Sequence, residues 1–272
     1  MRRQIFLGLI LFSLAFPRIA IAIDEKELKF GFYVDRLIVS SHTIVFNKTL
    51  NKRITEIGNR VAKASGRSDV KYTFRVVNDP TINAYAVAGG FVYINSGLLD
   101  TLESEDELAA ILAHEIGHIN KRHQINFIYA AHRGAVAKEI AGIITGTTLG
   151  ALFETMAKRY SYSYRYFYPP SPYQLGYWMG EPIGKGIGTA IVVSIIKGYG
   201  KKQELEADAL AVQYTKKAGY NPNALISFFK RLISIRDKLE ITEQNYVSNL
   251  INAEPGLEER IKNAEELISK IK

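Results

Sequence analysis

The sequence predicts an α+β domain that is mainly helical and carries one small β-sheet. Three observations support this class: apolar residues recur at helical spacing over 47–66, apolar and polar residues alternate over 71–76, and a strong capping signal opens a helix at 104. The chain has 272 residues, of which 47% are hydrophobic and 23% are charged. These values are ordinary for a globular protein and exclude a disordered chain, a collagen and a protein with many membrane spans.

The first 22 residues have the layout of a secretory signal peptide. Arg2 and Arg3 precede an apolar run over residues 5–16, and a small-residue pattern follows at 20–22. This run is shorter than the roughly 20 residues that a membrane-spanning helix needs, so a permanent anchor is the weaker interpretation. We expect cleavage at the end of that pattern, an exported protein, and a single domain over residues 23–272.

The positive charge of the chain is unevenly distributed. The formal net charge is +8, and three of the positive charges, Arg2, Arg3 and Arg18, belong to the predicted signal peptide, which leaves +5. Over residues 158–202, seven basic residues and one acidic residue give +6. The surplus is therefore local, and an exported protein is not expected to bind nucleic acid.

Periodicity and turn residues predict the elements of the first hundred positions in order. Residues 35–45 show no clean period and receive no assignment. The assigned elements are a helix over 47–66, a half-buried strand over 71–76, a short hairpin of 83–88 and 91–94 about Gly89-Gly90, and a turn at 95–97.

The helix that begins after Ser104 has strong local evidence. Glu107 lies three residues later and can complete a capping box, and apolar residues at helical spacing form a buried stripe as far as Ile119. Three later helices are predicted: 203–217 ended by Gly219, one from Asn221-Pro222 through Arg231, and a last one from Leu257 to the end.

This capped helix carries the pattern His114-Glu115-Ile116-Gly117-His118. Two histidines four residues apart project from one helical face and can share a zinc ion. The intervening Glu115 then lies beside the metal and can take a proton from its bound water. The alternative is a pair of surface histidines on an amphipathic helix, which the helix context makes the weaker interpretation.

A catalytic zinc site needs a third protein ligand. The chain has no cysteine, so the ligand must be a histidine or a carboxylate. Glu204 and Asp208 lie four residues apart on one predicted helical face, where one can bind metal and the other can orient a ligating imidazole; Glu206 points elsewhere. Spacing alone leaves this open, because an acidic helical face is usually only solvated. The remaining histidines are His42, His123 and His132.

The order of these motifs resembles the zinc metallopeptidase family that includes HtpX, the CAAX prenyl proteases, Oma-type proteases and the periplasmic proteins LoiP and BepA. The shared features are the HExxH helix, the later Glu-x-x-Ala-Asp segment, and the stretch over residues 83–99 before the helix. The similarity covers roughly residues 50–262. It implies a mainly helical, gluzincin-type metallopeptidase domain with an edge hairpin before the active-site helix.

The resemblance also implies roles for individual residues. His114, His118 and Glu204 would bind one Zn²⁺ per chain, Asp208 would support them from behind, and Glu115 would be the general base. An extended substrate polypeptide can add as a strand to the hairpin, at 84–87 or at 91–94. The substrate-binding residues assigned from this reasoning are Asn83, Ala84, Tyr85 and Ala86.

One position departs from the family pattern near the carboxyl terminus. Soluble members commonly carry a His-Pro followed by four residues and Arg, whereas residues 254–260 of this chain place Glu254 at the histidine position. The carboxylate can cap the zinc, or a gating role is absent. Arg260 matches the family arginine and is a candidate to stabilise charge on a tetrahedral intermediate; a structural salt bridge is an equal alternative.

A long insertion, at about 133–200, separates the two halves of the metal site. It contains two Gly-rich apolar segments that are too short to span a bilayer, and the aromatic and basic stretch 158–202 begins inside it. We favour two helices packed on the active-site helix and joined by a Tyr/Pro-rich loop. The composition also suits a lid over the zinc cleft or a contact with the membrane surface.

The leading hypothesis is an exported zinc endopeptidase that hydrolyses unfolded or misassembled envelope proteins, in the periplasm or attached to the envelope. The rival is a non-proteolytic, chaperone-like envelope assembly factor with a plugged or structural zinc site, an interpretation that Glu254 supports. A basic, membrane-associated structural protein would explain the insertion but not the HExxH pattern.

Overall fold

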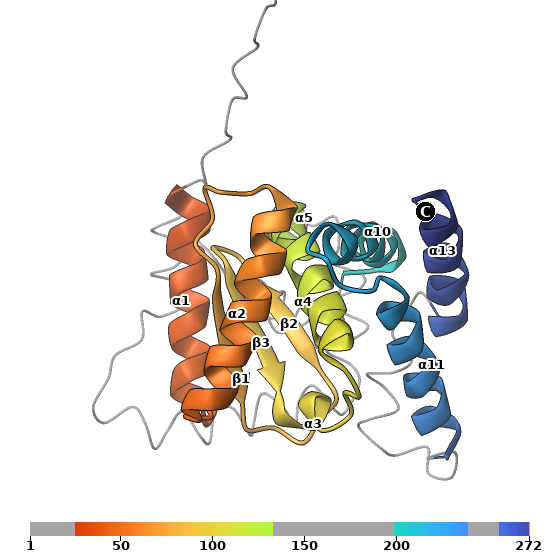
Figure 1. The fold of residues 1–272 in the computed structure, drawn as a ribbon. Coiled ribbons are helices and arrows are strands. Elements are labelled where there is room, and N and C mark those ends of the chain that lie inside the picture. The colour runs from red at the N-terminus through yellow and green to blue at the C-terminus, as the bar shows by residue number, and fades with distance from the viewer. Residues whose placement is uncertain (1–24, 133–198, 239–255, 272) are drawn as a thin grey trace, which may run out of the picture.

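The computed structural model describes residues 25–132, 199–238 and 256–271. The predicted signal peptide and most of the insertion lie outside these ranges. Figure 1 shows a small sheet with helices beside it, so the predicted α+β, mainly helical class is confirmed. The helices are α1 (Glu25–Ser41), α2 (Lys48–Ser65), α3 (Ser96–Leu99), α4 (Glu105–Asn120), α5 (His123–His132), α10 (Lys201–Lys217), α11 (Asn223–Lys238) and α13 (Leu257–Lys270); the strands are β1 (Thr73–Val77), β2 (Ala84–Val87) and β3 (Phe91–Asn95).

The described sheet has the strand order β1-β3-β2. Strands β2 and β3 form the predicted antiparallel hairpin, and Gly89 and Gly90 adopt φ values of +84° and +103° in its turn. Strand β1 pairs with β3 in parallel, which the sequence does not predict. Strand β2 therefore lies at an edge of the sheet, and its edge borders the metal-binding helix described below.

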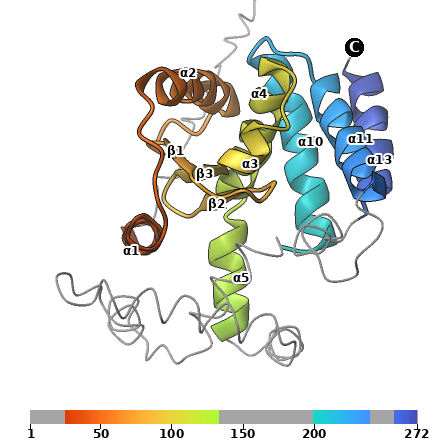
Figure 2. The same ribbon diagram turned by 90° about the horizontal axis from the view of Figure 1, so that it is seen from below.

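Both faces of the sheet are covered, and the alternation of side chains explains how. Val76 and Ile94 belong to a core shared with α2, α4, α10, α11 and α13. Val77 and Tyr93, one position along on the same strands, belong to a second core with α1 and α5. Figure 2 shows α1 and α2 on opposite sides of the sheet. Strand β3 is buried along its whole length because both of its faces are packed.

Helix α1 covers part of the segment that sequence periodicity leaves unassigned, residues 35–45. Residues 35–41 of this segment form the last part of α1, which ends at Ser41. Phe30 and Val34 bury one face, whereas Phe32 and Val39 remain exposed on others. The exposed apolar residues fill the polar positions of the pattern, so the period is obscured.

Two other predicted boundaries differ from the structure. The turn expected at 95–97 is the start of the single-turn helix α3. The helix expected to end at Arg231 continues to Lys238, because Leu232 and Ile235 still pack against the main core. The helices predicted over 47–66, 203–217 and from 257 are confirmed. In the described part of the chain, no helix combines the length and apolarity that a membrane crossing requires.

A buried polar cluster joins α1 to the sheet. Arg75 on β1 donates hydrogen bonds to both carboxylate oxygens of Asp35 on α1, at 2.9 and 3.2 Å. Tyr93 on β3 donates its hydroxyl hydrogen to the same carboxylate. Burial raises the pKa of Tyr93 above its ordinary value, and the Asp35 carboxylate raises it further, so the phenol stays protonated as a donor.

Replacing Asp35 by Ala should destabilise the fold by about 2–3 kcal/mol, because Arg75 and Tyr93 would lose their shared acceptor in a buried setting. Urea unfolding measures the change. The matched control is Glu56→Ala, whose ion pair with Lys52 is exposed and has an N–O separation of 3.8 Å. The control should cost less than about 0.5 kcal/mol. Equal losses in the two variants would contradict the assignment.

Candidate metal centre

Helix α4 begins at a cap that also anchors α11. Ser104 Oγ accepts a hydrogen bond from the Glu107 amide at 3.2 Å, as predicted. The reciprocal half differs from the predicted capping box, because Glu107 Oε2 accepts from the Glu103 amide at 2.8 Å. Arg231 explains this position, since it donates to both Glu107 oxygens at 2.6 and 2.8 Å. The cap and the ion pair together fix the start of the helix that carries the HExxH pattern.

One face of α4 brings His114 and His118 together. Their Nε2 atoms lie 2.9 Å apart. Glu204, near the start of α10, faces the same point, with oxygens 3.4 Å from His114 Nε2 and 3.8 Å from His118 Nε2. Ligand atoms of the three residues all lie within 4.8 Å of one another, so the group could hold a metal ion.

The close packing of α4 on α10 makes this convergence possible. A Cβ atom at Gly117 would lie 3.3 Å from the Ala207 carbonyl oxygen and 3.4 Å from the Ala207 Cα. Ala207 is itself fully buried. Small residues on both helices let the backbones approach, and the approach brings Glu204 within reach of the two histidines.

A buried ion pair contacts His114 at Nδ1, the ring nitrogen that faces away from His118. Asp208 is fully buried one turn after Glu204, and its Oδ1 lies 2.9 Å from His114 Nδ1. Arg260 on α13 donates to both oxygens of Asp208 at 2.7 Å. The same guanidinium lies over the Phe229 ring, 4.4 Å from its centre. Arg260 thus forms a buried salt bridge at the edge of the site, with Nη2 3.7 Å from Glu204 Oε2.

The charges of the site favour ionised carboxylates. Burial alone would raise the pKa of Glu204, but His118 and His114 hold it well below its ordinary value. Burial would likewise raise the pKa of Asp208, and Arg260 holds it below the ordinary range. Both groups can therefore act as anionic partners of a cation.

The two histidines respond to their surroundings in opposite directions. Burial would lower the pKa of His114, but its hydrogen bonds to Asp208 and Glu204 outweigh burial and raise that pKa to about 10. Burial lowers the pKa of His118, so its ring is neutral and its lone pair is available. A bound metal cation would have to displace the proton from His114.

Glu115 has the environment of a general base. Burial raises its pKa to about 7, while the neighbouring His114 and a hydrogen bond with the Ala86 backbone on β2 lower it in part. A carboxyl group with a pKa near neutrality can both accept and return a proton. Glu115 is also in contact with the strand that sequence reasoning selects for substrate.

The predicted substrate segment, Asn83 to Ala86, consists of the residue before β2 and the first three residues of that strand. The Asn83 carbonyl accepts from the Asn95 amide at 2.9 Å, so backbone groups of odd-numbered residues face β3. Those of Ala84 and Ala86 face the other side of the edge strand. The Tyr85 ring is buried and stacked on another tyrosine, so this segment offers backbone groups more than its aromatic side chain.

Two sequence-predicted features cannot be placed. Glu254, the candidate zinc cap, lies outside the described residues, and so does the aromatic and basic stretch 158–202 except for its last four positions.

Sequence reasoning does not find three residues that the structure brings to the site. His123 Nδ1 lies 2.8 Å from His118 Nδ1, and His123 Nε2 lies 3.3 Å from Glu206 Oε2. The Tyr199 ring packs on His118 at 4.7 Å between ring centres, and its amide donates to a Glu204 oxygen at 3.2 Å. The available signals were the position of His123 five residues after His118 and of Glu206 between the two predicted acids.

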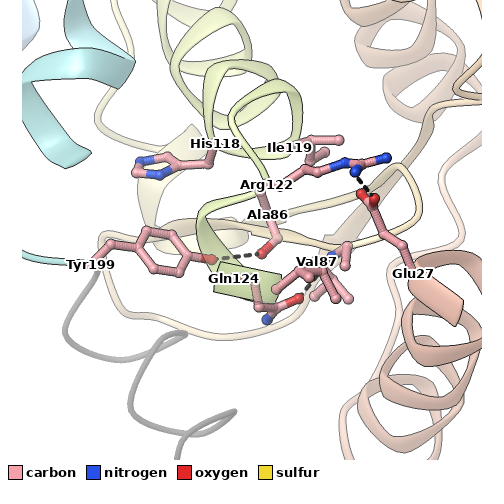
Figure 3. A pocket seen from close by; sticks show the side chains of 10 residues that line it. Glu27, Ala86, Val87, His118, Ile119, Arg122, Gln124 and Tyr199 are labelled. Carbon is pink, nitrogen blue, oxygen red and sulfur yellow. Dashed lines mark hydrogen bonds and ion pairs between the residues drawn. The ribbon is translucent and has the colours of Figure 1, made fainter. Parts of the chain in front are cut away.

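A small pocket lies beside His118, between β2 and the turn after α4 (Figure 3). Tyr199 Oη donates to the Ala86 carbonyl at 3.5 Å across it. Gln124 Oε1 accepts from the Ala88 amide at 2.7 Å at the far end of the strand. Side chains of the α4–α5 region and residue 199 therefore border the outer edge of β2.

Comparison with known families tests the resemblance of the motifs. The profile of peptidase family M48 matches residues 48–268, which is most of the chain. The chain belongs to peptidase family M48. The match includes α4 and α10, which carry the metal-binding group, and it confirms the resemblance drawn from the HExxH and Glu-x-x-Ala-Asp segments.

Several curated relatives of this M48 chain are proteases or metalloproteases by name. A putative beta-barrel assembly-enhancing protease of Vibrio cholerae is 28% identical over 211 residues, covering 76% of this chain and 38% of the relative. The mitochondrial metalloendopeptidase OMA1 of Schizosaccharomyces pombe is 26% identical over 200 residues, covering 74% and 47%. The metalloprotease LoiP of Escherichia coli is 24% identical over 223 residues, covering 82% and 72%. The chain thus spans less than half the length of the first two.

The donor set of this M48 chain fits zinc. Two imidazoles and one carboxylate are ligands that zinc accepts, and three protein ligands leave a fourth position open for water or substrate. His114 also has a carboxylate on its second nitrogen, as ligating histidines commonly do.

Zinc affinity should increase with pH, because the metal must displace the proton that Asp208 and Glu204 stabilise on His114. Below a pKa of about 10 this ring is protonated in the metal-free protein, so Kd should fall by up to about tenfold per pH unit between pH 6 and 8. Competition with a chelator of known affinity at each pH measures the slope. Asp208→Asn should flatten it, and an equal slope in both proteins would contradict this origin.

Proposed function

We propose that this chain is an exported zinc endopeptidase that hydrolyses peptide bonds of unfolded or misassembled envelope proteins. The observation that carries the proposal is the convergence of His114, His118 and Glu204, with Glu115 buried beside them. The signal-peptide pattern supports export, and relatives named as beta-barrel assembly-enhancing proteases support a place in the envelope. Contact of the 158–202 segment with a membrane surface belongs to the same proposal.

The proposed reaction is amide hydrolysis. Zinc held by His114, His118 and Glu204 would supply a Lewis acid and an acidified water molecule. Glu115 accepts the proton of the attacking water and returns it to the leaving amine, a double role that suits its pKa of about 7. Asp208 keeps His114 oriented, and Arg260 holds Asp208 ionised next to it. We also propose that Arg260, whose Nη2 lies 3.7 Å from Glu204 Oε2, stabilises negative charge that develops on the substrate during attack.

Substrate is proposed to bind as an added strand along β2. The backbone groups of Ala84 and Ala86 face the outer side of this edge strand, and Glu115 contacts the Ala86 backbone. A peptide paired there lies beside the proton acceptor. The Tyr199 hydroxyl, which approaches the Ala86 carbonyl, would have to yield its place to the substrate amide. Recognition through backbone groups suits substrates of varied sequence, such as unfolded chains.

Replacing Glu115 by Gln should leave one zinc bound per chain and reduce cleavage of an unfolded protein such as casein by about 100-fold or more. The amide fills the same space but cannot accept the proton. Metal analysis and a casein assay on the same samples measure both quantities, with the exposed Glu266→Gln as the control.

Retained cleavage by the Glu115 variant would refute the mechanism. One zinc per chain without any cleavage by the wild type would favour the non-proteolytic assembly factor.

Replacing Ala84 by Pro tests the strand-addition model. Proline removes one N–H from the outer side of an edge strand, a position where the sheet itself tolerates it. KM for a peptide substrate should rise by roughly three- to tenfold, the equivalent of one hydrogen bond, while zinc content stays the same. Ala84→Ser keeps the N–H and serves as the control. Equal KM values for the two variants would argue against backbone pairing at this position.

A further inference from the structure

Each metal-facing histidine has a second ring nitrogen, Nδ1, that needs a hydrogen-bond partner. The two rings have partners of different kinds. His114 presents its Nδ1 to Asp208 at 2.9 Å, which is a direct carboxylate partner. His118 presents its Nδ1 to the Nδ1 of His123 at 2.8 Å. His123 in turn presents Nε2 to Glu206 Oε2 at 3.3 Å. We call each such chain of contacts that starts at a ligand histidine an arm. The arm behind His118 therefore also ends in a carboxylate, and the His123 imidazole lies between His118 and that carboxylate.

The positions of the protons follow from this geometry. For His118 Nε2 to face a cation with its lone pair, the proton of the neutral ring must be on Nδ1. That N–H can donate only to an acceptor, so His123 Nδ1 must carry a lone pair and its own proton must be on Nε2. This second N–H points at the Glu206 carboxylate. The arrangement gives each N–H of the arm an acceptor.

The turn that precedes His123 contains a residue in an energetically unfavourable backbone conformation. Arg122, between α4 and α5, has φ +55°, and among the described residues it is the one non-glycine residue with a positive φ. Such conformations persist where the surroundings hold them, and they cluster at functional sites. The Arg122 side chain is held by the buried Glu27 at 2.9 Å, and the next residue but one, Gln124, binds the Ala88 amide.

The His123 ring is enclosed as well as bonded. The residue is 5% exposed, and the Tyr199 ring lies 4.7 Å from the centre of the His118 ring and 5.7 Å from that of His123. Packing on the rings restricts their rotation, so the contact between them is held in one geometry. Glu206, with a side chain 38% exposed, is the end of the arm that water reaches.

We propose that His123 and Glu206 form a positioning pair that fixes the tautomer and the orientation of His118 for metal binding. The pair matches the Asp208–Arg260 pair behind His114, and helix α10 supplies the carboxylate of both arms as well as Glu204. His123 is a positioning residue because it acts through His118. This inference rests on the zinc site of the proposed function.

The test measures zinc affinity by chelator competition in the full chain. His123→Leu keeps a side chain of similar bulk but removes both ring nitrogens and therefore the acceptor for His118, so zinc affinity should fall by about 10- to 100-fold. His123→Asn places its Oδ1 where the Nδ1 of histidine lies, and it should restore affinity to within roughly threefold of the wild type. Glu206→Gln should cause a smaller but measurable fall, of roughly three- to tenfold, because water can replace the carboxylate in part. His42→Leu, a histidine at the end of α1 bonded to Ser41, is the control.

The outcomes separate this inference from the proposed function. Wild-type protein that fails to bind zinc would overturn both. If the wild type binds zinc and His123→Leu, His123→Asn and Glu206→Gln all bind it with the affinity of the wild type, the positioning pair alone would be overturned. Urea unfolding of the metal-free chain would show whether His123→Leu folds. If it does not fold, Glu206→Gln is compared with the wild type instead. An unchanged zinc affinity and an unchanged catalytic rate in that variant would refute the inference. A purely structural role predicts lower unfolding stability with unchanged affinity in the folded fraction.

Discussion

Helix α4 packs directly against helix α10 through Gly117 and Ala207, and the metal-binding group depends on this contact. The two histidines come from α4 and the carboxylate from α10, so the separation of the two helices determines whether the three side chains can meet. A glycine in the middle of a helix lowers helix stability, yet here a side chain would meet the backbone of the partner helix at 3.3 Å. Close packing and metal geometry are therefore one constraint.

The buried charges of the site are tolerated because they are paired. Glu204, Asp208 and His114 are all withdrawn from solvent, and an isolated charge in such a place would be very unfavourable. Arg260 provides the compensating cation for Asp208 and reaches toward Glu204. Since Arg260 lies on α13, the last described helix is part of the electrostatic support of the site as well as of the core.

The sheet contributes an edge to the same site. Its two faces are covered by separate cores, so the outer side of β2 is its edge, and that edge contacts Glu115, the proposed base, through the Ala86 backbone. The turn between α4 and α5 then brings His123 back to His118 and Gln124 to the strand. One short turn thus connects the proposed ligand His118 with the strand.

The sequence by itself determined the features that repeat with the period of one element. Histidines four apart share a face of any α-helix, and the Ser104 cap, the β2–β3 hairpin and the helix after Asn47 are likewise local, so their patterns predict them. Helix α1 was missed because exposed Phe32 and Val39 mask its period.

Only the tertiary structure decided which elements meet. The parallel pairing of β1 with β3, the salt bridge of Arg260 with Asp208, and the contact of His123 with Glu206 join parts of the chain whose relation no local pattern encodes. Glu107 illustrates the reason. The sequence predicts that its carboxylate accepts from the Ser104 amide, but Arg231, 124 positions away, binds the carboxylate where it accepts from the Glu103 amide instead. Backbone periods are set by local geometry, whereas polar side chains choose among partners that only packing brings within reach.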